Sequence, residues 1–406
     1  MGLTILAKCK FEMKKIGFSA LFVLIALIVN AQSLEPVPGP KGLYGYKDSQ
    51  TGELVIPYRY DVARAFNDKG YAYVVMDAKE FCIDKIGNEA DPSYDRHFFF
   101  DGLMANRVGD KFGYIDTTGK QVILPFYDYI HSFTSGLALV YAQHRFYYIN
   151  TVGETVIDID PSDAYPFSGQ MALVKSREKG LWGCIDKTGK LVIDYRYSMV
   201  RPFFQGIAAI RWGEYWGFIT DCGVQILPCQ YESIGSFHEN RAMVQYDYFK
   251  GYVNKEGVLV IPMVYSNASS FSIGLACVQK DRRWGFIDTL GKVVIKLQFE
   301  DAYPFSDGLA CVQKNGRYGY IDLKGKVVIP CRYNDASSFS SAMAKVCNGD
   351  KYGYIDVEGI LVIPMEYDRA DSFNQMGTAL VSKDGKDFFI NKRGEYVRDA
   401  KGAPDL

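Results

Sequence analysis

A short motif, an aromatic residue followed by Gly, a second aromatic residue, Ile and Asp, returns along this chain at a nearly constant interval. Clear copies begin at Tyr318 and Tyr352. The fourth positions of successive copies are 32 to 36 residues apart: Lys47, Ile83, Ile115, Ile149, Ile185, Ile219, Val253, Ile287, Ile321, Ile355 and Ile390. This period is typical of a protein whose repeats pack against their neighbours. We therefore expect about ten repeats and a partial C-terminal unit over residues 42–398, with a tail at 399–406 and no separate catalytic domain.

Each repeat reads as a series of short strands. The motif itself alternates as a half-buried strand does, and its Gly is expected to let a backbone or ring of the next repeat approach closely. Asp or Asn then precedes Gly by three residues, as in Asp322 and Gly325, which suits a turn that the Asp side chain caps and the left-handed Gly closes. A second apolar strand runs to Pro330, and Pro should end that strand or mark a sheet edge because it cannot donate to the ladder.

The rest of the repeat is a connector and a third strand. In the connector, Tyr333, Ala336 and Phe339 are spaced by three residues, and we expect the rings to plug the core, with a single helical turn as one possibility. The third strand leads into Asn-Gly, a strong hairpin signal. The sequence thus predicts an all-β fold of tandem ~34-residue repeats, each a three-stranded antiparallel meander plus connector, stacked in an open twisted or solenoid-like array. Propeller-like halves are the alternative, since a single propeller usually has about four to eight blades.

The tandem pattern aromatic-Gly-[Phe/Tyr]-Ile-Asp-x-x-Gly-Lys-x-Val-Ile-Pro-x-x-Tyr-Asp resembles the WG-repeat (KWG-type) family of bacterial proteins. The resemblance covers nearly the whole chain after the N-terminal segment. It implies a repeat architecture and binding or surface roles, and it implies no common reaction. Phe81 and Tyr147 stand where the motif has Gly, and residues 91–100 replace the usual Ile-Pro segment, so we expect disturbed stacking there.

The N-terminus has the pattern of a secretory signal peptide over residues 1–31. A basic start at Met13 precedes an apolar run over residues 16–29, and small residues follow at Val29 and Ala31. The run is shorter than the roughly 20 residues of a membrane span, although an uncleaved anchor is the alternative. We expect export to the periplasm, cell surface or medium, no membrane span after signal removal, and a Pro-rich linker at residues 32–41.

Charge and motifs exclude several kinds of chemistry. The chain has 46 Lys and Arg against 47 Asp and Glu, which argues against nucleic-acid binding. It has no nucleophile elbow, phosphate loop, dinucleotide fingerprint or His-based metal spacing. We therefore expect no catalytic residue, no metal and no cofactor. The cysteines read as free buried thiols, with a bridge between Cys277 and Cys311 as the alternative because both occupy the same strand position.

Binding is expected where the repeats differ. Residues 144–148, 211–216 and 246–250 gather cations and rings near the hairpin tip that precedes the motif. Such side chains can hold sugars or peptides through stacking and cation–π contacts. The alternative is that the rings merely cover the next repeat. The candidate ligand-binding residues are Arg211, Trp212, Tyr215, Arg145, Tyr147, Tyr246 and Tyr248.

These observations favour an exported, non-enzymatic repeat protein that binds protein or glycan at the cell envelope. A structural spacer or assembly scaffold without a small ligand is the alternative. A hydrolase of envelope polymers, using carboxylates from different repeats, is a remote alternative. The sequence names neither the partner nor the oligomeric state.

Overall fold

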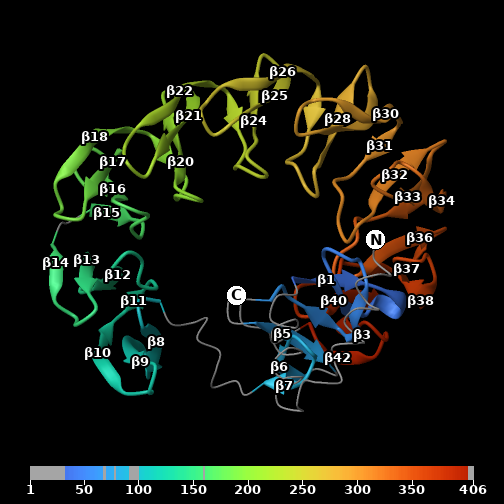
Figure 1. Ribbon diagram of the computed structural model, residues 1–406, viewed down its shortest axis with the longest axis horizontal. Coiled ribbons are helices and arrows are strands. Elements are labelled where there is room, and N and C mark those ends of the chain that lie inside the picture. The colour runs from blue at the N-terminus through green and yellow to red at the C-terminus, as the bar shows by residue number, and fades with distance from the viewer. Residues whose placement is uncertain (1–32, 67–69, 77–78, 91–99, 159–160, 401–406) are drawn as a thin grey trace, which may run out of the picture. The chain divides into compact units, whose positions relative to one another are not determined.

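The computed structural model describes residues 33–66, 70–76, 79–90, 100–158 and 161–400. The chain divides into two compact units: unit 1 combines residues 1–94 with residues 306–406, and unit 2 comprises residues 95–305. Figure 1 shows that each unit is a succession of small antiparallel sheets. The expected signal peptide lies outside the described residues.

Unit 1 contains one 3-10 turn, η1 (Pro40–Gly42), and strands from both ends of the chain. Its N-terminal strands are β1 (Leu34–Pro38), β2 (Tyr44–Asp48), β3 (Leu54–Tyr60), β4 (Val62–Ala63), β5 (Tyr71–Met76), β6 (Lys79–Asp84) and β7 (Glu89–Ala90). Its C-terminal strands are β32 (Ala310–Lys314), β33 (Arg317–Ile321), β34 (Val327–Tyr333), β35 (Asp335–Ala336), β36 (Met343–Asn348), β37 (Lys351–Asp356), β38 (Leu361–Tyr367), β39 (Arg369–Ala370), β40 (Thr378–Lys383), β41 (Lys386–Asn391) and β42 (Tyr396–Asp399).

Unit 2 holds the central repeats. Its strands are β8 (Leu103–Val108), β9 (Lys111–Asp116), β10 (Gln121–Tyr127), β11 (Tyr129–Ile130), β12 (Leu137–Ala142), β13 (Arg145–Asn150), β14 (Thr155–Ile157), β15 (Pro161–Ala164), β16 (Met171–Ser176), β17 (Trp182–Asp186), β18 (Leu191–Tyr197), β19 (Met199–Val200), β20 (Ile207–Trp212), β21 (Tyr215–Thr220), β22 (Gln225–Tyr231), β23 (Ser233–Ile234), β24 (Ala242–Tyr246), β25 (Phe249–Val253), β26 (Leu259–Tyr265), β27 (Asn267–Ala268), β28 (Leu275–Lys280), β29 (Arg283–Asp288), β30 (Val293–Phe299) and β31 (Asp301–Ala302).

The predicted all-β repeat is confirmed, and each typical sheet has one strand more than expected. In the order β35-β36-β37-β38, the three long strands form the predicted meander, and the connector residues Asp335 and Ala336 add a short first strand. The connector contains no helical turn among the described repeats, because it returns through the tight bridge between Ser340 and Met343.

The predicted turn residues lie where they were expected. Asn315 and Gly316, with φ of 53° and 70°, connect β32 to β33 in the left-handed conformations of a two-residue hairpin. In the next turn of most repeats an Asp or Asn side chain acts as a cap. Asp116 Oδ1 accepts hydrogen bonds from the backbone N–H of Thr118 at 2.8 Å and of Lys120 at 3.1 Å. The Thr118 hydroxyl also donates to Asp116 Oδ1, at 2.6 Å. That bond first, and the backbone bonds with it, hold the pKa of Asp116 below its ordinary value.

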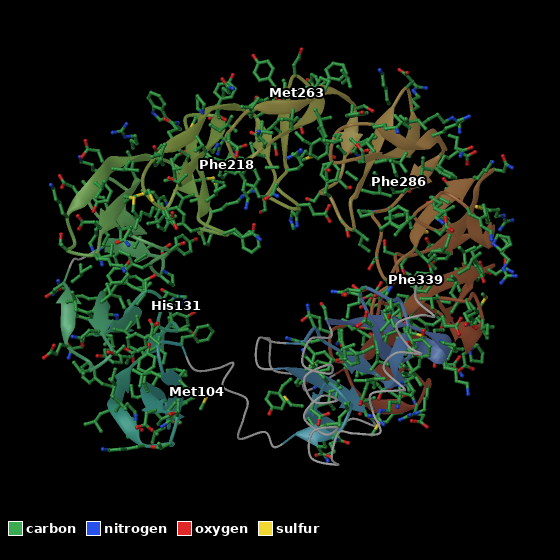
Figure 2. The ribbon with its side chains drawn as sticks, in the orientation of Figure 1. Met104, His131, Phe218, Met263, Phe286 and Phe339 are labelled. Atoms are coloured by element: carbon green, nitrogen blue, oxygen red, sulfur yellow. The ribbon has the colours of Figure 1, made fainter. Side chains whose placement is uncertain are left out.

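A pair of rings fixes the core of most repeats. The second ring of the motif packs on the Phe of the connector, as Tyr320 does on Phe339 at 4.8 Å between ring centroids. The Tyr320 hydroxyl also donates to the Ser337 carbonyl at 2.8 Å. Figure 2 marks three rings from such pairs, Phe218, Phe286 and Phe339. The pairs are Tyr46–Phe66, Tyr114–Phe133, Tyr148–Phe167, Phe218–Phe237, Tyr252–Phe271, Phe286–Phe305, Tyr320–Phe339 and Tyr354–Phe373.

The motif Gly allows a close approach, but within its own repeat rather than between repeats. A Cβ at Gly319 would lie 2.5 Å from the carbonyl oxygen of Ile329 and 2.6 Å from the backbone nitrogen of Cys331 on β34. There β34 shifts register against β33, and Pro330 lies inside the shift. Pro330 therefore does not end the strand; it sits in a bulge on the last strand of the meander, where its missing N–H breaks no ladder bond.

Neighbouring repeats share cores and hydrogen bonds. Leu137 and Leu139 of one repeat belong to the same apolar cluster as Phe167 of the next. Thr134 donates its hydroxyl to the Phe167 carbonyl at 2.8 Å. Glu239 accepts from the backbone N–H of Gly274, 35 residues ahead, at 2.9 Å. Stacking of adjacent repeats is therefore confirmed within the units.

The segment at residues 32–41 is not a linker, in contrast to our expectation. Its residues 34–38 form β1, which pairs with β2, and Leu34 is buried in the core of the first sheet. Pro36 and Pro38 fit there because β1 is the edge of the order β1-β2-β3.

Unit 1 also joins the two ends of the chain through a set of contacts that we call the terminal clasp. The Lys392 side chain, 2% exposed, donates to the carbonyl oxygens of Gly42, at 2.8 Å, and Asp61. The Lys41 backbone N–H donates to Asp356 Oδ2 at 2.9 Å. The Tyr44 hydroxyl donates to Asp307 Oδ1 at 3.0 Å.

The departure at Tyr147 shortens its sheet. Where other repeats have Gly, an added Cβ would collide with the following strand, as at Gly183 with the Ile193 carbonyl at 2.6 Å. In the repeat that carries Tyr147, the following strand β14 has three residues and pairs only with Tyr148 and Ile149. The predicted local disturbance is therefore present at Tyr147. Residues 91–99 of the other departure lie outside the described residues.

Candidate functional site

Five of the sequence candidates lie on two successive hairpins of unit 2, and four of them are aromatic residues. The hairpin β20–β21 carries Trp212 and Tyr215 as cross-strand partners, and β24–β25 carries Tyr246 and Tyr248. Together with Phe249 they form what we call the tip surface. Their exposed fractions are 66% for Trp212, 41% for Tyr215, 47% for Tyr246, 83% for Tyr248 and 48% for Phe249.

A shallow groove connects the two hairpins of the tip surface. It has a volume of about 480 Å³ and is lined by Tyr215, Tyr246 and Met263, together with Cys229, Gln230 and Tyr231. Met263 is marked in Figure 2. Because Tyr215 and Tyr246 belong to different repeats, this groove brings together two rings that the sequence predicted separately.

The tip of the second hairpin holds its ring in a costly backbone conformation. Asp247 and Tyr248 have φ of 48° and 67°. At the same place in other repeats, Gly316 and Gly385 follow Asn315 and Asp384. A bulky side chain in the left-handed region is unfavourable by roughly 1 kcal/mol. His144 and Arg282, with φ of 64° and 61°, hold the same conformation at their tips, so Tyr248 shares this strain and adds to it a large ring exposed to solvent.

The remaining candidates have partners within the fold. Arg211 forms an ion pair with Glu214 at 3.0 Å on the first hairpin. Arg145 lies on the hairpin β12–β13 and forms an ion pair with Asp158 at 2.9 Å. Tyr147 packs against the apolar core, with Arg145 at 5.7 Å from its ring centroid. Arg145 and Tyr147 therefore do not line the groove between the tip hairpins.

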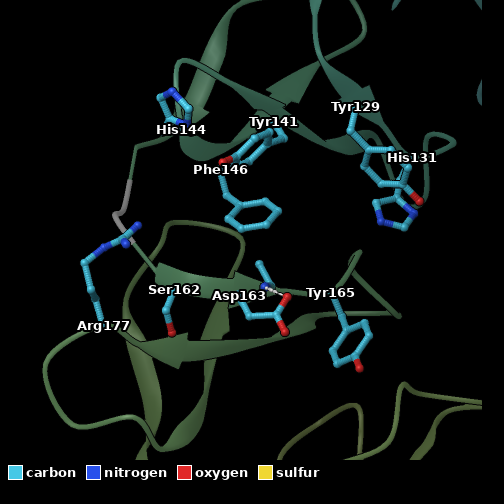
Figure 3. Close-up of a pocket in the computed structure, with 10 residues that line it drawn as sticks. Tyr129, His131, Tyr141, His144, Phe146, Ser162, Asp163, Tyr165 and Arg177 are labelled. Atoms are coloured by element: carbon cyan, nitrogen blue, oxygen red, sulfur yellow. Dashed lines mark hydrogen bonds between the residues drawn. The ribbon is translucent and has the colours of Figure 1, made fainter.

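A second hollow, which we call the ring groove, lies between the repeats that meet at β13 and β15 (Figure 3). Its volume is about 730 Å³. One wall holds Tyr129, Tyr141, Phe146 and His131. The other wall holds Ser162, Asp163 and Tyr165, and His144 and Arg177 lie at its margin.

Most residues of the ring groove lie outside the segments in which the sequence predicts binding. Phe146 belongs to the predicted segment 144–148, whereas Tyr129, Tyr141, Asp163 and Tyr165 belong to none. The signal that could have found them is a position-by-position comparison of repeats, because Tyr129 and Tyr141 depart from the residues at the same places elsewhere.

The described side chains have the properties of a structural array. Burial raises the pKa of the Cys184 thiol to about 12 and that of Cys277 to about 11. No disulfide bond joins the eight described cysteines, of which Cys277 and Cys311 are buried and Cys222 is exposed. Within the described ranges, no three His, Cys, Asp or Glu side chains gather as a metal site would require. No helix in the part that the structure describes has the length and apolar character to cross a bilayer.

The sheets, turns and shared cores define a tandem-repeat protein of the all-β class. The chain belongs to the WG-repeat family, since the family model for the WG containing repeat matches nine segments: residues 44–79, 112–141, 148–179, 182–214, 216–248, 251–283, 284–318, 318–352 and 352–386. The resemblance inferred from the motif is thereby confirmed.

The similarity to individual proteins does not indicate a function for this chain. A search of curated proteins gave no match. Solved structures similar to this chain include a eukaryotic initiation factor, at 12% identity and a TM-score of 0.38, covering 72% of this chain and 94% of that one. Dihydro-heme d1 dehydrogenase NirN is similar at 13% identity and a TM-score of 0.30, covering 77% of this chain and 74% of that one. Hsv2 of Kluyveromyces lactis is similar at 10% identity and a TM-score of 0.24, covering 63% of this chain and 89% of that one. TM-scores this low assign no function.

Proposed function

We propose that this protein is an exported, non-enzymatic repeat protein that binds a protein or glycan partner at the cell envelope through the tip surface. The observation that carries the proposal is Tyr248, whose ring is 83% exposed at a residue with φ of 67°. Strain at an exposed aromatic residue is better explained by recognition than by packing.

The composition of the tip surface supports a binding role over that of a spacer. Trp and Tyr dominate the energy of protein interfaces because they bury a large area and retain a polar end. A spacer has no need for exposed rings, and the hairpin tips at Asn315-Gly316 and Asp384-Gly385 do without them. A spacer or scaffold role is nevertheless the alternative that the experiment must separate.

The export and the lack of catalysis are parts of the same proposal. Export is supported by the basic and apolar pattern of residues 1–31. The non-enzymatic role is supported by a chain filled with repeats and by Asp side chains, such as Asp116, that are engaged in capping turns. Protease treatment of intact cells, with detection of the chain, tests the location.

The binding test compares matched variants of the mature chain. Wild-type residues 32–406, a Trp212→Ala/Tyr248→Ala variant and a Phe126→Ala control are each titrated onto immobilised envelope fractions. Phe126 is 51% exposed on β10, away from the tip hairpins, so its loss removes a ring without touching the tip surface. We expect binding by the wild type and the control, and at least about tenfold weaker binding by the double variant.

Two results would contradict the proposal. Equal binding by all three proteins would leave the tip surface without a role and favour the scaffold. Release of soluble sugars or peptides from the envelope fraction by the purified protein would show turnover, which a non-enzymatic binder does not produce.

A further inference from the structure

Three rings of the ring groove form a continuous row across three strands. Tyr129 is the cross-strand partner of Tyr141, and Tyr141 is the partner of Phe146. Partners in a sheet project to the same face, and neighbouring strands lie about 4.8 Å apart, so the row is about 10 Å long. The rings of Tyr141 and Phe146 are 4.9 Å apart, and His131 adds a fourth ring 5.0 Å from Tyr129.

The row is a property of this repeat and not of the family pattern. The four following repeats of unit 2 carry at most one ring at the same three positions. These rows are Asp163–Lys175–Trp182, Met199–Arg211–Trp216, Ser233–Gln245–Lys250 and Asn267–Gln279–Trp284. Since those sheets fold without the rings, packing alone does not require Tyr129 and Tyr141.

The groove is open because the next strand is short. In most other repeats the residue at the position of Phe146 pairs with a Tyr or Phe on the following strand, as Trp182 does with Tyr197 and Trp284 with Phe299. The strand β14 ends at Ile157, and its pairings stop at Tyr148, so no described residue of β14 pairs with Phe146. The ring at Tyr147 that displaces the motif Gly therefore also uncovers one side of the row.

The wall opposite the rings is polar and held in place. Asp163 Oδ1 accepts the backbone N–H of Ala164 at 2.9 Å, and a carboxylate has capacity to accept further hydrogen bonds. Tyr165 stacks on the buried Trp182 at 5.2 Å with an interplanar angle of 18°, which braces its ring. Figure 3 shows the Asp163 side chain below the Phe146 ring, whereas the Ser162 hydroxyl points away from that ring and donates to the Lys175 carbonyl at 3.4 Å.

We propose that the ring groove is a carbohydrate-binding site, separate from the tip surface, that takes a neutral oligosaccharide. The apolar C–H face of a sugar ring would lie on Tyr141 and Phe146, and the next sugar would reach Tyr129. Hydroxyl groups on the opposite edge would donate to the Asp163 carboxylate. A row about 10 Å long matches two consecutive sugar rings, and the combination of rings and fixed polar groups suits a ligand with apolar faces and polar edges.

Other ligand classes fit the groove less well. An extended peptide would need a free strand edge, and β11 offers only two residues for such a ladder. A polyanion would meet the Asp163 carboxylate, and the guanidinium of Arg177 at the margin already donates to the Pro161 carbonyl at 3.2 Å. Burial lowers the pKa of His131, which favours its uncharged ring. Both classes are nevertheless measured in the test.

The experiment titrates the mature chain by calorimetry with cellotriose, chitotriose and maltotriose, and with pooled peptides and inorganic polyphosphate as the two competing classes. The variants are Tyr129→Ala and Asp163→Asn, and the control is Met199→Ala, which truncates the residue that stands at the place of Tyr129 in a later repeat. Asn should preserve the backbone contact of Asp163, because Asn267 Oδ1 accepts the Ala268 N–H at the same distance of 2.9 Å. Tyr129 is 53% exposed, so its loss should leave the melting temperature nearly unchanged.

We expect at least one trisaccharide to bind the wild type with a Kd below about 1 mM. Tyr129→Ala and Asp163→Asn should each bind it at least tenfold more weakly, and the Met199→Ala control should bind it as the wild type does. The proposal is overturned if no trisaccharide binds, if both variants bind as the wild type does, or if only pooled peptides or polyanions bind. Loss of sugar binding in Trp212→Ala/Tyr248→Ala, with Tyr129→Ala unaffected, would place the sugar on the tip surface and overturn it as well. The partner-binding test of the tip surface gives an independent answer.

Discussion

Replacing Lys392 by Met tests whether a buried amine controls the joining of the two chain ends. In the native protein Lys392 Nζ donates to the carbonyl oxygens of Gly42 and Asp61 and lies 4.9 Å from the Tyr44 ring centroid. Burial lowers the pKa of Lys392 to about 7, against the opposing effect of the Asp61 and Asp307 carboxylates. Met keeps the apolar stem and removes the titrating group.

The sign of the pH effect follows from the two protonation states. The pKa of Lys392 in the folded protein is about 7, below the ordinary value of 10.5, so the unfolded chain holds the proton more often between these pH values. Stability of the terminal clasp therefore rises with pH over that range. Integrated from pH 7 to pH 9, the gain is about 2 kcal/mol.

The assay must separate unit 1 from unit 2. All four Trp residues lie between residues 182 and 284, so fluorescence follows unit 2. Hydrogen exchange in peptides that cover residues 39–48 and 386–399, corrected for the intrinsic rate, follows the clasp. We expect protection of the wild type to rise from pH 7 to pH 9 and that of Lys392→Met to stay flat. Lys386→Met, which changes an exposed residue of β41, the strand that ends just before Lys392, should follow the wild type.

Two outcomes would refute this reasoning. If Lys392→Met keeps the pH dependence of the wild type, another group titrates. If fluorescence melting changes as much as exchange in unit 1, the effect is not confined to the clasp.

Three further predictions concern the repeat itself. Gly319→Val should destabilise its sheet by about 1–3 kcal/mol, because the new side chain collides with the Ile329 carbonyl. Hydrogen exchange should become faster in β33 and β34 alone, and unchanged exchange would mean that the close approach is not required. Asp186→Ala should lower the midpoint of unfolding, whereas Asp186→Asn should not, because Asn accepts the same turn bonds in other repeats. If Asp186→Ala unfolds at the same midpoint as the wild type, Asp186 does not stabilise its turn as a cap. In the native protein Cys222, which is exposed, should react with a thiol reagent well before buried Cys277, whose pKa is raised, and mass spectrometry showing the opposite order would contradict the burial assignment.

Much of the fold is predictable because its signals are local. Asn315-Gly316 and the Asp322-x-x-Gly turn each specify a backbone conformation within four residues, and the regular spacing multiplies the evidence. The connector strand at Asp335 was missed because two residues have too little pattern to mark a strand.

The candidate sites were only partly predictable, for a different reason. The rings of the tip surface are adjacent in sequence, so composition alone revealed Trp212 and Tyr248. The row Tyr129–Tyr141–Phe146 depends on strand register, and its opposite wall comes from the next repeat. Neither can be read from a single window of sequence.

The terminal clasp has a consequence for the order in which the protein matures. The contact of Lys392 with Gly42 joins positions 350 residues apart, and closing a flexible loop of that length costs about 5 kcal/mol in chain entropy. Because synthesis proceeds from the N-terminus, β1–β7 are made first but lack their clasp partners until the last strands are made. We expect unit 2 to complete its folding before unit 1, which needs the C-terminal strands. In a nascent or truncated chain, the N-terminal repeats should therefore stay accessible to chaperones and proteases for longer than the repeats of unit 2.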